Sequence, residues 1–200
     1  MKASRRFFFF PLAAIGLAAL LSGCAATAPN YSDIVAAPDR SEADRMNDQR
    51  RKPVELYGFT GARPGMKVLD MGAGGGYSTE LLARAVAPGG TVYSQTPPDL
   101  FPGAIKAYAA RAQSPAMKNA IRLERPFDDP LPPGVADIDL VTFFFAYHDT
   151  AHLGVDRTRM NRRLYEALKP GGILILADHS ARPGDGANVT KSLHRIEESV

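Results

Sequence analysis

The 200-residue chain carries 24 basic residues, 21 acidic residues and a single cysteine. Three of the basic residues and none of the acidic ones precede Cys24, so the rest of the chain has 21 of each sign and no net charge. This balance excludes the basic surface of a nucleic-acid-binding domain, and one cysteine excludes a framework of internal disulfides.

The first 24 residues have the pattern of an export signal. A short basic head is followed by an apolar stretch over residues 7–21 and by Leu21-Ser22-Gly23-Cys24. The apolar stretch is shorter than a typical membrane span. The last four residues resemble a bacterial lipobox, which implies cleavage before Cys24 and a lipid on its thiol. We therefore expect an exported protein, held by that lipid on the periplasmic face of a bacterial membrane; an ordinary signal peptide or an uncleaved anchor is the alternative.

A second export pattern overlaps the first. Ser4-Arg5-Arg6-Phe7-Phe8-Phe9 resembles the twin-arginine consensus, which directs proteins that are already folded. Two ordinary arginines in a general secretory signal are the alternative. Residues 25–40 are rich in Ala, Pro and Ser and are predicted to be a flexible tether. Residues 41–200 are then expected to form one domain.

The expected domain alternates strand and helix patterns. Residues 41–57 read as a charged helix that Pro53 breaks or kinks. The predicted strands cover residues 66–71, 91–95, 120–124, 138–146 and 173–177. The predicted helices cover residues 78–87, 104–112 and 188–199, with a further helix around Met160 and Leu164. This order predicts an α/β fold, doubly wound, with a mainly parallel sheet and helices on both faces.

A glycine-rich turn follows the first predicted strand. The motif is Asp-x-Gly-x-Gly-x-Gly over residues 70–76. Because Tyr77 stands where a dinucleotide site needs its third glycine, and no lysine follows, the turn is neither a dinucleotide fingerprint nor a P-loop. Glycines let the backbone approach a ligand closely, and the helix after them begins with unpaired N–H groups. A turn that binds nothing is the alternative.

This motif resembles the first motif of the class I (Rossmann-like) S-adenosylmethionine-dependent methyltransferases. The resemblance covers about residues 54–180 and includes Leu168-Lys169-Pro170-Gly171-Gly172 ahead of the last predicted strand. Residues 44–56 are similar to a segment of predicted exported methyltransferases that would cover the cofactor pocket; a solvated helix face is the alternative. Members of the family continue with two more strands, so C-terminal strands are expected to be missing here and an apolar sheet edge to be exposed.

The resemblance implies that S-adenosylmethionine is the cofactor and assigns its contacts. The methionine part would be held by Asp70 and by the backbone of Gly72, Ala73, Gly74 and Gly76. Tyr77 would cap the turn or merely pack against it. Gln95 stands where the family carries an acid that binds the ribose hydroxyls, and its neutral amide would bind them more weakly.

The same resemblance assigns the adenine and acceptor sides of the site. Phe127 would pack on the adenine ring and Asp128 would accept a hydrogen bond from its amino group; an exposed acidic turn is the alternative. Tyr147-His148-Asp149 follows the fourth strand, where the family places residues facing the methyl acceptor. A pair of His148 and Asp149 would serve as general base, unless the histidine only braces the loop.

Two further observations concern the same edge of the predicted sheet. Asp178-His179 ends the fifth strand and therefore lies near the expected cleft. His148 and His152 have helical spacing that suits a metal ion, but the sequence shows no third ligand, so no metal site is predicted.

The sequence therefore predicts a lipid-anchored S-adenosylmethionine-dependent methyltransferase acting on a small or envelope acceptor. S-adenosylmethionine is made in the cytoplasm, which conflicts with export. The alternative is a non-catalytic exported lipoprotein that reuses the fold as a binding or scaffold domain.

Overall fold

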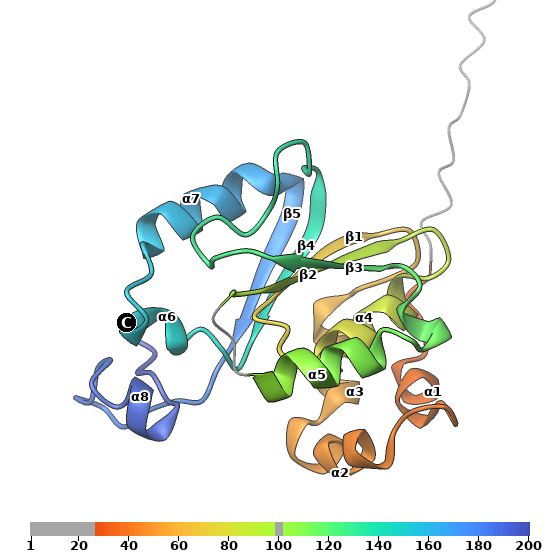
Figure 1. The fold of residues 1–200 in the computed structure, drawn as a ribbon, viewed down its shortest axis with the longest axis horizontal. Coiled ribbons are helices and arrows are strands. Elements are labelled where there is room, and N and C mark those ends of the chain that lie inside the picture. Colours follow the sequence, from red (N-terminus) through yellow and green to blue (C-terminus); the bar gives the residue numbers. More distant parts are fainter. Residues whose placement is uncertain (1–26, 99–101) are drawn as a thin grey trace, which may run out of the picture.

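One parallel sheet with helices on both faces makes up the domain (Figure 1). The computed structural model describes residues 27–98 and 102–200, so the predicted export signal and Cys24 lie outside the described residues. The strand order is β3-β2-β1-β4-β5, and every neighbouring pair is parallel. Within the described ranges, no helix combines the length and apolar character needed to cross a membrane. The predicted fold class is confirmed.

The elements follow the predicted order. The strands are β1 (Lys67–Met71), β2 (Thr91–Thr96), β3 (Ala120–Glu124), β4 (Ile138–Phe144) and β5 (Leu168–Ala177). The main helices of the sheet layers are α4 (Tyr77–Val86), α5 (Pro102–Arg111) and α7 (Arg157–Ala167), with the short η1 (Pro115–Met117) before β3 and α6 (Asp149–His152) after β4. Strand β4 ends two residues earlier than predicted, because Phe145 takes a left-handed φ of 58° that turns the chain.

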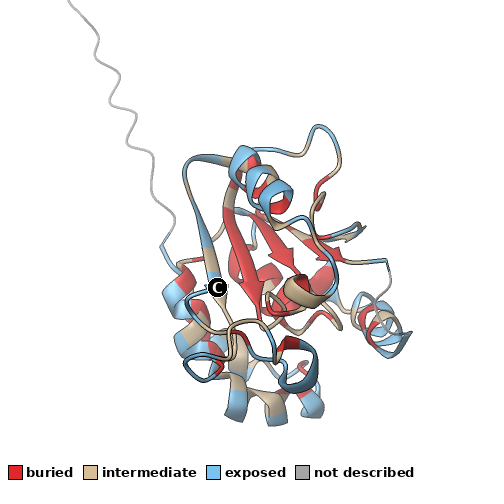
Figure 2. Ribbon diagram, turned by 90° about the vertical axis from the view of Figure 1, so that its left-hand side faces the viewer, coloured by how far each residue is buried: buried red, intermediate tan, exposed pale blue. Residues whose placement is uncertain are grey.

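The two faces of the sheet carry separate cores. Val68 and Leu140 belong to a core that also contains Leu82 of α4. Their neighbours Leu69 and Val141 belong to the opposite core, which includes residues of α7. This is the period-two alternation that a strand imposes on its side chains, and Figure 2 shows the buried strands enclosed between the outer layers.

The segment predicted as a flexible tether is partly folded. Residues 31–36 form α1 (Tyr31–Ala36), with Asn30 accepting a hydrogen bond from the Ser32 N–H at 3.0 Å. The buried Tyr31 donates its hydroxyl to the Ala62 carbonyl, which ties α1 to the body of the domain. The tether prediction is therefore wrong for α1, because it was based on composition and did not weigh the burial of one aromatic ring.

The charged helix before the sheet is divided as the proline predicts. It forms α2 (Glu42–Arg51) and α3 (Pro53–Thr60), which are separated by Lys52 in a left-handed conformation with φ 49°. Pro53 occupies the first position of α3, where its missing N–H costs nothing.

The chain after β5 differs from the prediction. Only α8 (Thr190–Leu193) is helical, instead of residues 188–199. The helix ends because His194 adopts φ 52°, and Ile196 then exchanges backbone hydrogen bonds with His179 and Ala181, both at 3.0 Å. Strand β5 is an edge of the described sheet, and its exposed apolar residues agree with the expected apolar edge: Ile173, Leu174 and Leu176.

Candidate functional site

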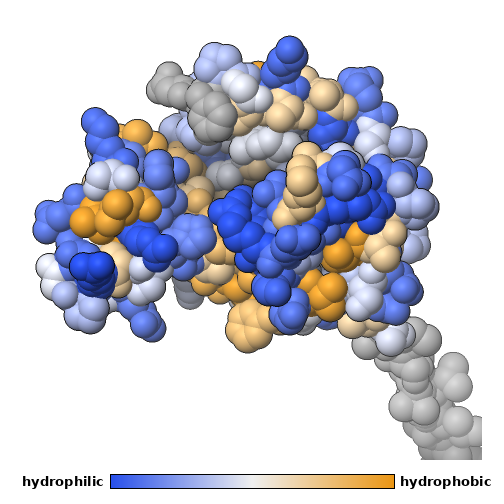
Figure 3. Space-filling model, turned by 90° about the horizontal axis from the view of Figure 1, so that it is seen from below, coloured by the Kyte–Doolittle hydropathy of each residue, from blue (hydrophilic) through white to orange (hydrophobic). Residues whose placement is uncertain are grey.

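A cavity of about 670 Å³ lies where the glycine turn follows β1. Six residues predicted for the site line it: Gly72, Ala73, Gly74, Tyr77, Phe127 and Asp149. Figure 3 shows a hollow between the part of the molecule that contains α8 and the part that contains α2. A volume of this size is typical of pockets for small organic ligands. The cavity lies beyond the carboxyl ends of β1 and β4, as expected for an open parallel sheet.

Three glycines of the turn have positive φ but different surroundings. A Cβ on Gly72 would lie 2.8 Å from the Cβ of Ala146, so the wall of the cavity requires glycine there. A Cβ on Gly74, at φ 55°, would meet only the Gly72 carbonyl at 3.9 Å and would point into open space. Gly76, at φ 82°, is the N-cap residue before α4 and does not line the cavity. The turn therefore leaves its free volume at Gly74, where a ligand can approach the backbone.

Asp70 lies beneath the cavity and does not line it. Its side chain accepts hydrogen bonds from the hydroxyls of Thr79 at 2.7 Å and Thr142 at 3.0 Å, and the residue is 1% exposed. Both carboxylate oxygens are thus engaged by the protein. The structure does not bring Asp70, which was expected to hold the methionine part of the cofactor, to the cavity wall; its side chain fixes the end of β1 to α4 and β4.

The buried Asp70 predicts a pH dependence of stability. Burial raises its pKa to about 6, although hydrogen bonds from Thr79 and Thr142 lower it. Because the unfolded chain releases this proton near pH 4, the folded state holds more protons between pH 4 and 6. We expect this group to reduce the free energy of unfolding by about 3 kcal/mol as the pH rises through that window.

The measurement compares urea unfolding of the wild type and of Asp70→Asn from pH 4 to pH 7. The asparagine cannot ionise, so the difference in unfolding free energy between the two proteins should change between about pH 4 and 6 and be constant above pH 6. Parallel stability curves for the two proteins would contradict the assignment.

The structure gives Gln95 a different role from the predicted one. The side chain is fully buried; its Oε1 accepts a hydrogen bond from the Gly72 N–H at 2.9 Å, and its Nε2 donates to the Arg125 carbonyl at 2.6 Å. Gln95 does not line the cavity, so neither end of its amide is placed toward a ribose there. Gln95 instead joins the glycine turn to the loop after β3.

The predicted adenine pair is separated in the structure. Phe127 is buried, lines the cavity and stacks on Phe143 with ring centroids 5.5 Å apart. Asp128 is half-buried and does not belong to the cavity wall. Phe127 thus remains available to an aromatic ligand face, whereas the structure offers no cavity contact for Asp128.

Helix α2 supplies a wall that agrees with the predicted cover over the pocket. Arg51 lines the cavity, and its guanidinium lies 4.9 Å from the centroid of the Tyr77 ring and 5.1 Å from that of Phe145. Burial and the neighbouring Asp48 raise the pKa of Tyr77, so the phenol keeps its proton and donates to Asp48 at 2.6 Å. Arg40 pairs with the same Asp48 at 2.7 Å. These contacts hold the last turn of α2 over the glycine turn.

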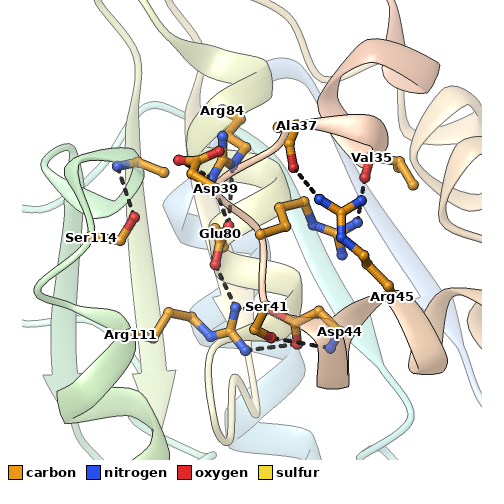
Figure 4. Close-up of polar contacts among 12 residues, drawn as sticks. Val35, Ala37, Asp39, Ser41, Asp44, Arg45, Glu80, Arg84, Arg111 and Ser114 are labelled. Carbon is orange, nitrogen blue, oxygen red and sulfur yellow. Dashed lines mark hydrogen bonds and ion pairs between the residues drawn. The ribbon is translucent and has the colours of Figure 1, made fainter.

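A second set of charges fastens α2 to α4 and α5. Arg111 of α5 donates to both oxygens of Asp44 at 2.6 and 2.9 Å and pairs with Glu80 of α4 (Figure 4). Glu80 also accepts from Arg84, which reaches Asp39 ahead of α2. Asp44 and Glu80 are both buried. The wall formed by α2 is therefore positioned by buried ion pairs.

The predicted catalytic pair has a different geometry. His148 is buried and does not line the cavity, whereas Asp149 does. The Nδ1 of His148 lies 2.8 Å from Asp178, and its Nε2 lies 3.3 Å from the Asp149 carboxylate. The ring of His148 thus has its closest carboxylate partner at the end of β5. Its Nε2 also lies 3.3 Å from Nδ1 of His194, a residue that the sequence did not indicate.

Several cavity residues were not assigned from the sequence. Most are apolar and come from the strand ends and from α6: Pro97, Pro98, Phe144, Phe145, Ala146 and Leu153. The hydrophobic run of β4 predicted burial and gave no signal that its last residues turn toward a cavity. Arg51 was contained in the predicted cover segment but was not singled out.

Comparison with known proteins identifies relatives of this domain. A family described as "Methyltransferase domain" matches residues 62–199. Protein-L-isoaspartate O-methyltransferase 1 of Arabidopsis thaliana is 32% identical over 115 residues, which are 57% of this chain and 46% of the relative. The chain thus spans about half the length of that curated relative.

Two solved structures share the fold at low sequence identity. A SAM-dependent methyltransferase from Aquifex aeolicus superposes with a TM-score of 0.54 at 20% identity, covering 78% of this chain and 77% of its own. An arsenic(III) S-adenosylmethionine methyltransferase from Chlamydomonas reinhardtii superposes with a TM-score of 0.57 at 18% identity, covering 87% of this chain and 59% of its own.

Proposed function

The chain belongs to the methyltransferase domain family, and we propose that it binds S-adenosylmethionine in the cavity at the glycine turn and methylates a small or envelope acceptor. The observation that carries the proposal is the open space beside Gly74, at the carboxyl end of β1. When bound, S-adenosylmethionine supplies an activated methyl group on a sulfonium ion. The transfer then depends mainly on how the protein aligns the two reactants.

The cavity wall has the groups that such a cofactor needs. Phe127 offers a flat apolar face for an adenine ring, and the backbone at Gly74 offers close approach. Among the described residues, Gly74 and Gly75 donate their N–H groups to no other part of the protein. These free donors and the first turn of α4 suit the carboxylate of a methionine moiety. The residues present therefore fit the cofactor.

Arg51 is the cation that we assign to the same carboxylate. It lines the cavity beside Tyr77, and its planar guanidinium is held between two aromatic rings. Asp149 is an acidic group of the wall and suits the ammonium group of the cofactor or a polar acceptor. The apolar side chains of Phe144 and Phe145 also line the cavity, which suits the apolar parts of the cofactor.

The proposal also includes export and a lipid on Cys24. Its support is the pattern of residues 1–24, with a basic head, an apolar stretch and the lipobox-like end. The envelope acceptor follows from that location.

We expect the wild-type protein to bind S-adenosylmethionine with micromolar affinity and Arg51→Ala to bind it about 10- to 100-fold more weakly, because a hydrogen bond to a charged group is lost. Isothermal titration calorimetry measures both. The control is Arg50→Ala, which removes the neighbouring exposed arginine of the same helix and should leave the affinity unchanged.

Absence of heat with the wild type would overturn the proposed function. Equal affinities for Arg51→Ala and the wild type would remove Arg51 from the site but leave the cavity as the binding place.

A further inference from the structure

The adjacent His148 and Asp149 meet His194, which lies 46 residues after His148, beside the cavity. The Nε2 of His148 lies 3.3 Å from Nδ1 of His194 and 3.3 Å from Oδ1 of Asp149, and the last two atoms are 3.9 Å apart. Two ligands on a tetrahedral ion with bonds of about 2.1 Å are about 3.4 Å apart. The three atoms therefore lie close to the spacing of three ligands around one ion.

The orientation of His148 is fixed from its other side. Its Nδ1 lies 2.8 Å from one oxygen of Asp178, and its backbone N–H donates to the other oxygen at 2.7 Å. The side chains of His148 and Asp178 are both about 4% exposed. A carboxylate that holds the distal nitrogen of a histidine fixes the tautomer that leaves the other nitrogen free to bind a metal. Nε2 of His148 is therefore prepared as a ligand.

The position of His194 is held at a conformational cost. The residue has φ 52°, a conformation that residues other than glycine adopt rarely. It directly follows α8, which packs against α6, the helix that begins with Asp149. The strained turn brings the ring of His194 to 5.3 Å from that of His148. The side chain of His194 is mostly exposed, so burial in a hydrophobic core does not account for its position beside His148.

We propose that His148, Asp149 and His194 bind a divalent first-row transition-metal ion, with Zn²⁺ as the best match to two imidazoles and one carboxylate. Asp178 orients the first ligand. Three protein ligands leave a fourth position for water or another small ligand, as in catalytic zinc sites. Because Asp149 also lines the cavity, the ion and the cavity share a wall.

A network of hydrogen bonds without a metal is the competing explanation. In that case His194 donates to His148, and Asp149 contributes only its charge to the pair. The two explanations differ in whether the isolated protein retains an ion with defined stoichiometry. Metal binding can be measured without S-adenosylmethionine, so its outcome does not depend on the proposed function.

The test titrates the tag-free, metal-stripped protein with Co²⁺, followed by its visible absorption, and then displaces Co²⁺ with Zn²⁺. We expect one equivalent of Co²⁺ with the intense bands of a four- or five-coordinate ion. His194→Asn should weaken binding at least about 100-fold because one ligand is lost, and asparagine tolerates the left-handed backbone, so the fold is kept. Asp178→Asn should weaken binding about 10- to 100-fold.

His179→Gln is the matched control. His179 follows Asp178 directly and stacks on Phe145, with ring centroids 5.0 Å apart, but it is outside the triangle. This variant should bind Co²⁺ like the wild type. The proposal is overturned if the wild type binds no stoichiometric Co²⁺, or if His194→Asn and His179→Gln bind it equally well.

Discussion

Replacing Gly74 by valine is expected to reduce the affinity for S-adenosylmethionine at least about 100-fold, the largest effect on binding that the cavity predicts. The new side chain would project into the space that we assign to the ligand, since a Cβ at this position meets nothing closer than 3.9 Å. The φ of 55° also strains any β-branched residue, at a cost on the order of 1–3 kcal/mol. Calorimetric titration measures the affinity, and urea unfolding measures the strain.

Gly61→Val separates the two effects. Gly61 has a similar φ of 63°, also faces open space, and ends α3 outside the cavity. We expect both valine variants to lose similar stability, while only Gly74→Val loses binding. If Gly74→Val binds the cofactor as the wild type does, the glycine turn is not the binding site.

Replacing Arg111 by alanine is expected to cost about 3–5 kcal/mol of unfolding free energy, the largest effect on stability. The substitution would leave Asp44 buried without its bidentate partner, and Glu80 would keep only Arg84. An uncompensated buried carboxylate is far more costly than the loss of an exposed pair. Denaturant unfolding monitored by circular dichroism provides the measurement.

The control for this variant is Arg159→Ala. Arg159 lies 3.8 Å from Asp129 with half of its side chain exposed, so its removal should cost less than about 1 kcal/mol. Similar losses for the two alanine variants would show that the cluster on α2 is no more important than a surface pair.

The loss caused by Arg111→Ala should also depend on pH. Burial raises the pKa of Asp44, but the hydrogen bond and charge of Arg111 outweigh it, so the pKa lies below its usual value. The stabilisation is therefore present above the unfolded pKa of about 3.9 and is lost as the pH falls through the lower folded value. The difference in unfolding free energy between the wild type and Arg111→Ala should therefore become smaller in that acidic range.

Most of the fold could be predicted because its signals are local. The apolar run of β4 and the glycines after β1 determine their elements over a few residues. The chain also breaks at Lys52 and at Phe145, where the backbone is left-handed. Pro53 is a local signal for the first break, whereas the sequence has no local signal for the second. The folded state of α1 depends on the burial of Tyr31 against residues about 30 positions away, which composition does not report.

The site could be predicted only in part, because only its local signals are visible in the sequence. The turn residues line the cavity because the motif itself carries their geometry. The partners of His148 are different: Asp178 is 30 residues away and His194 is 46 residues away. Asp70 and Gln95 were assigned to a ligand because their motif positions were known, but their hydrogen-bond partners in the fold were not.

The amide of Gln95 also limits how this chain can change. Its Oε1 faces an N–H and its Nε2 faces a carbonyl, so the position needs an acceptor at one end and a donor at the other. An acid there, as the resembled family carries, would set two oxygens against each other in a buried place. A Gln95→Glu substitution would therefore be tolerated only if the loop after β3 moved its Arg125 carbonyl away, and the two positions are constrained to change together.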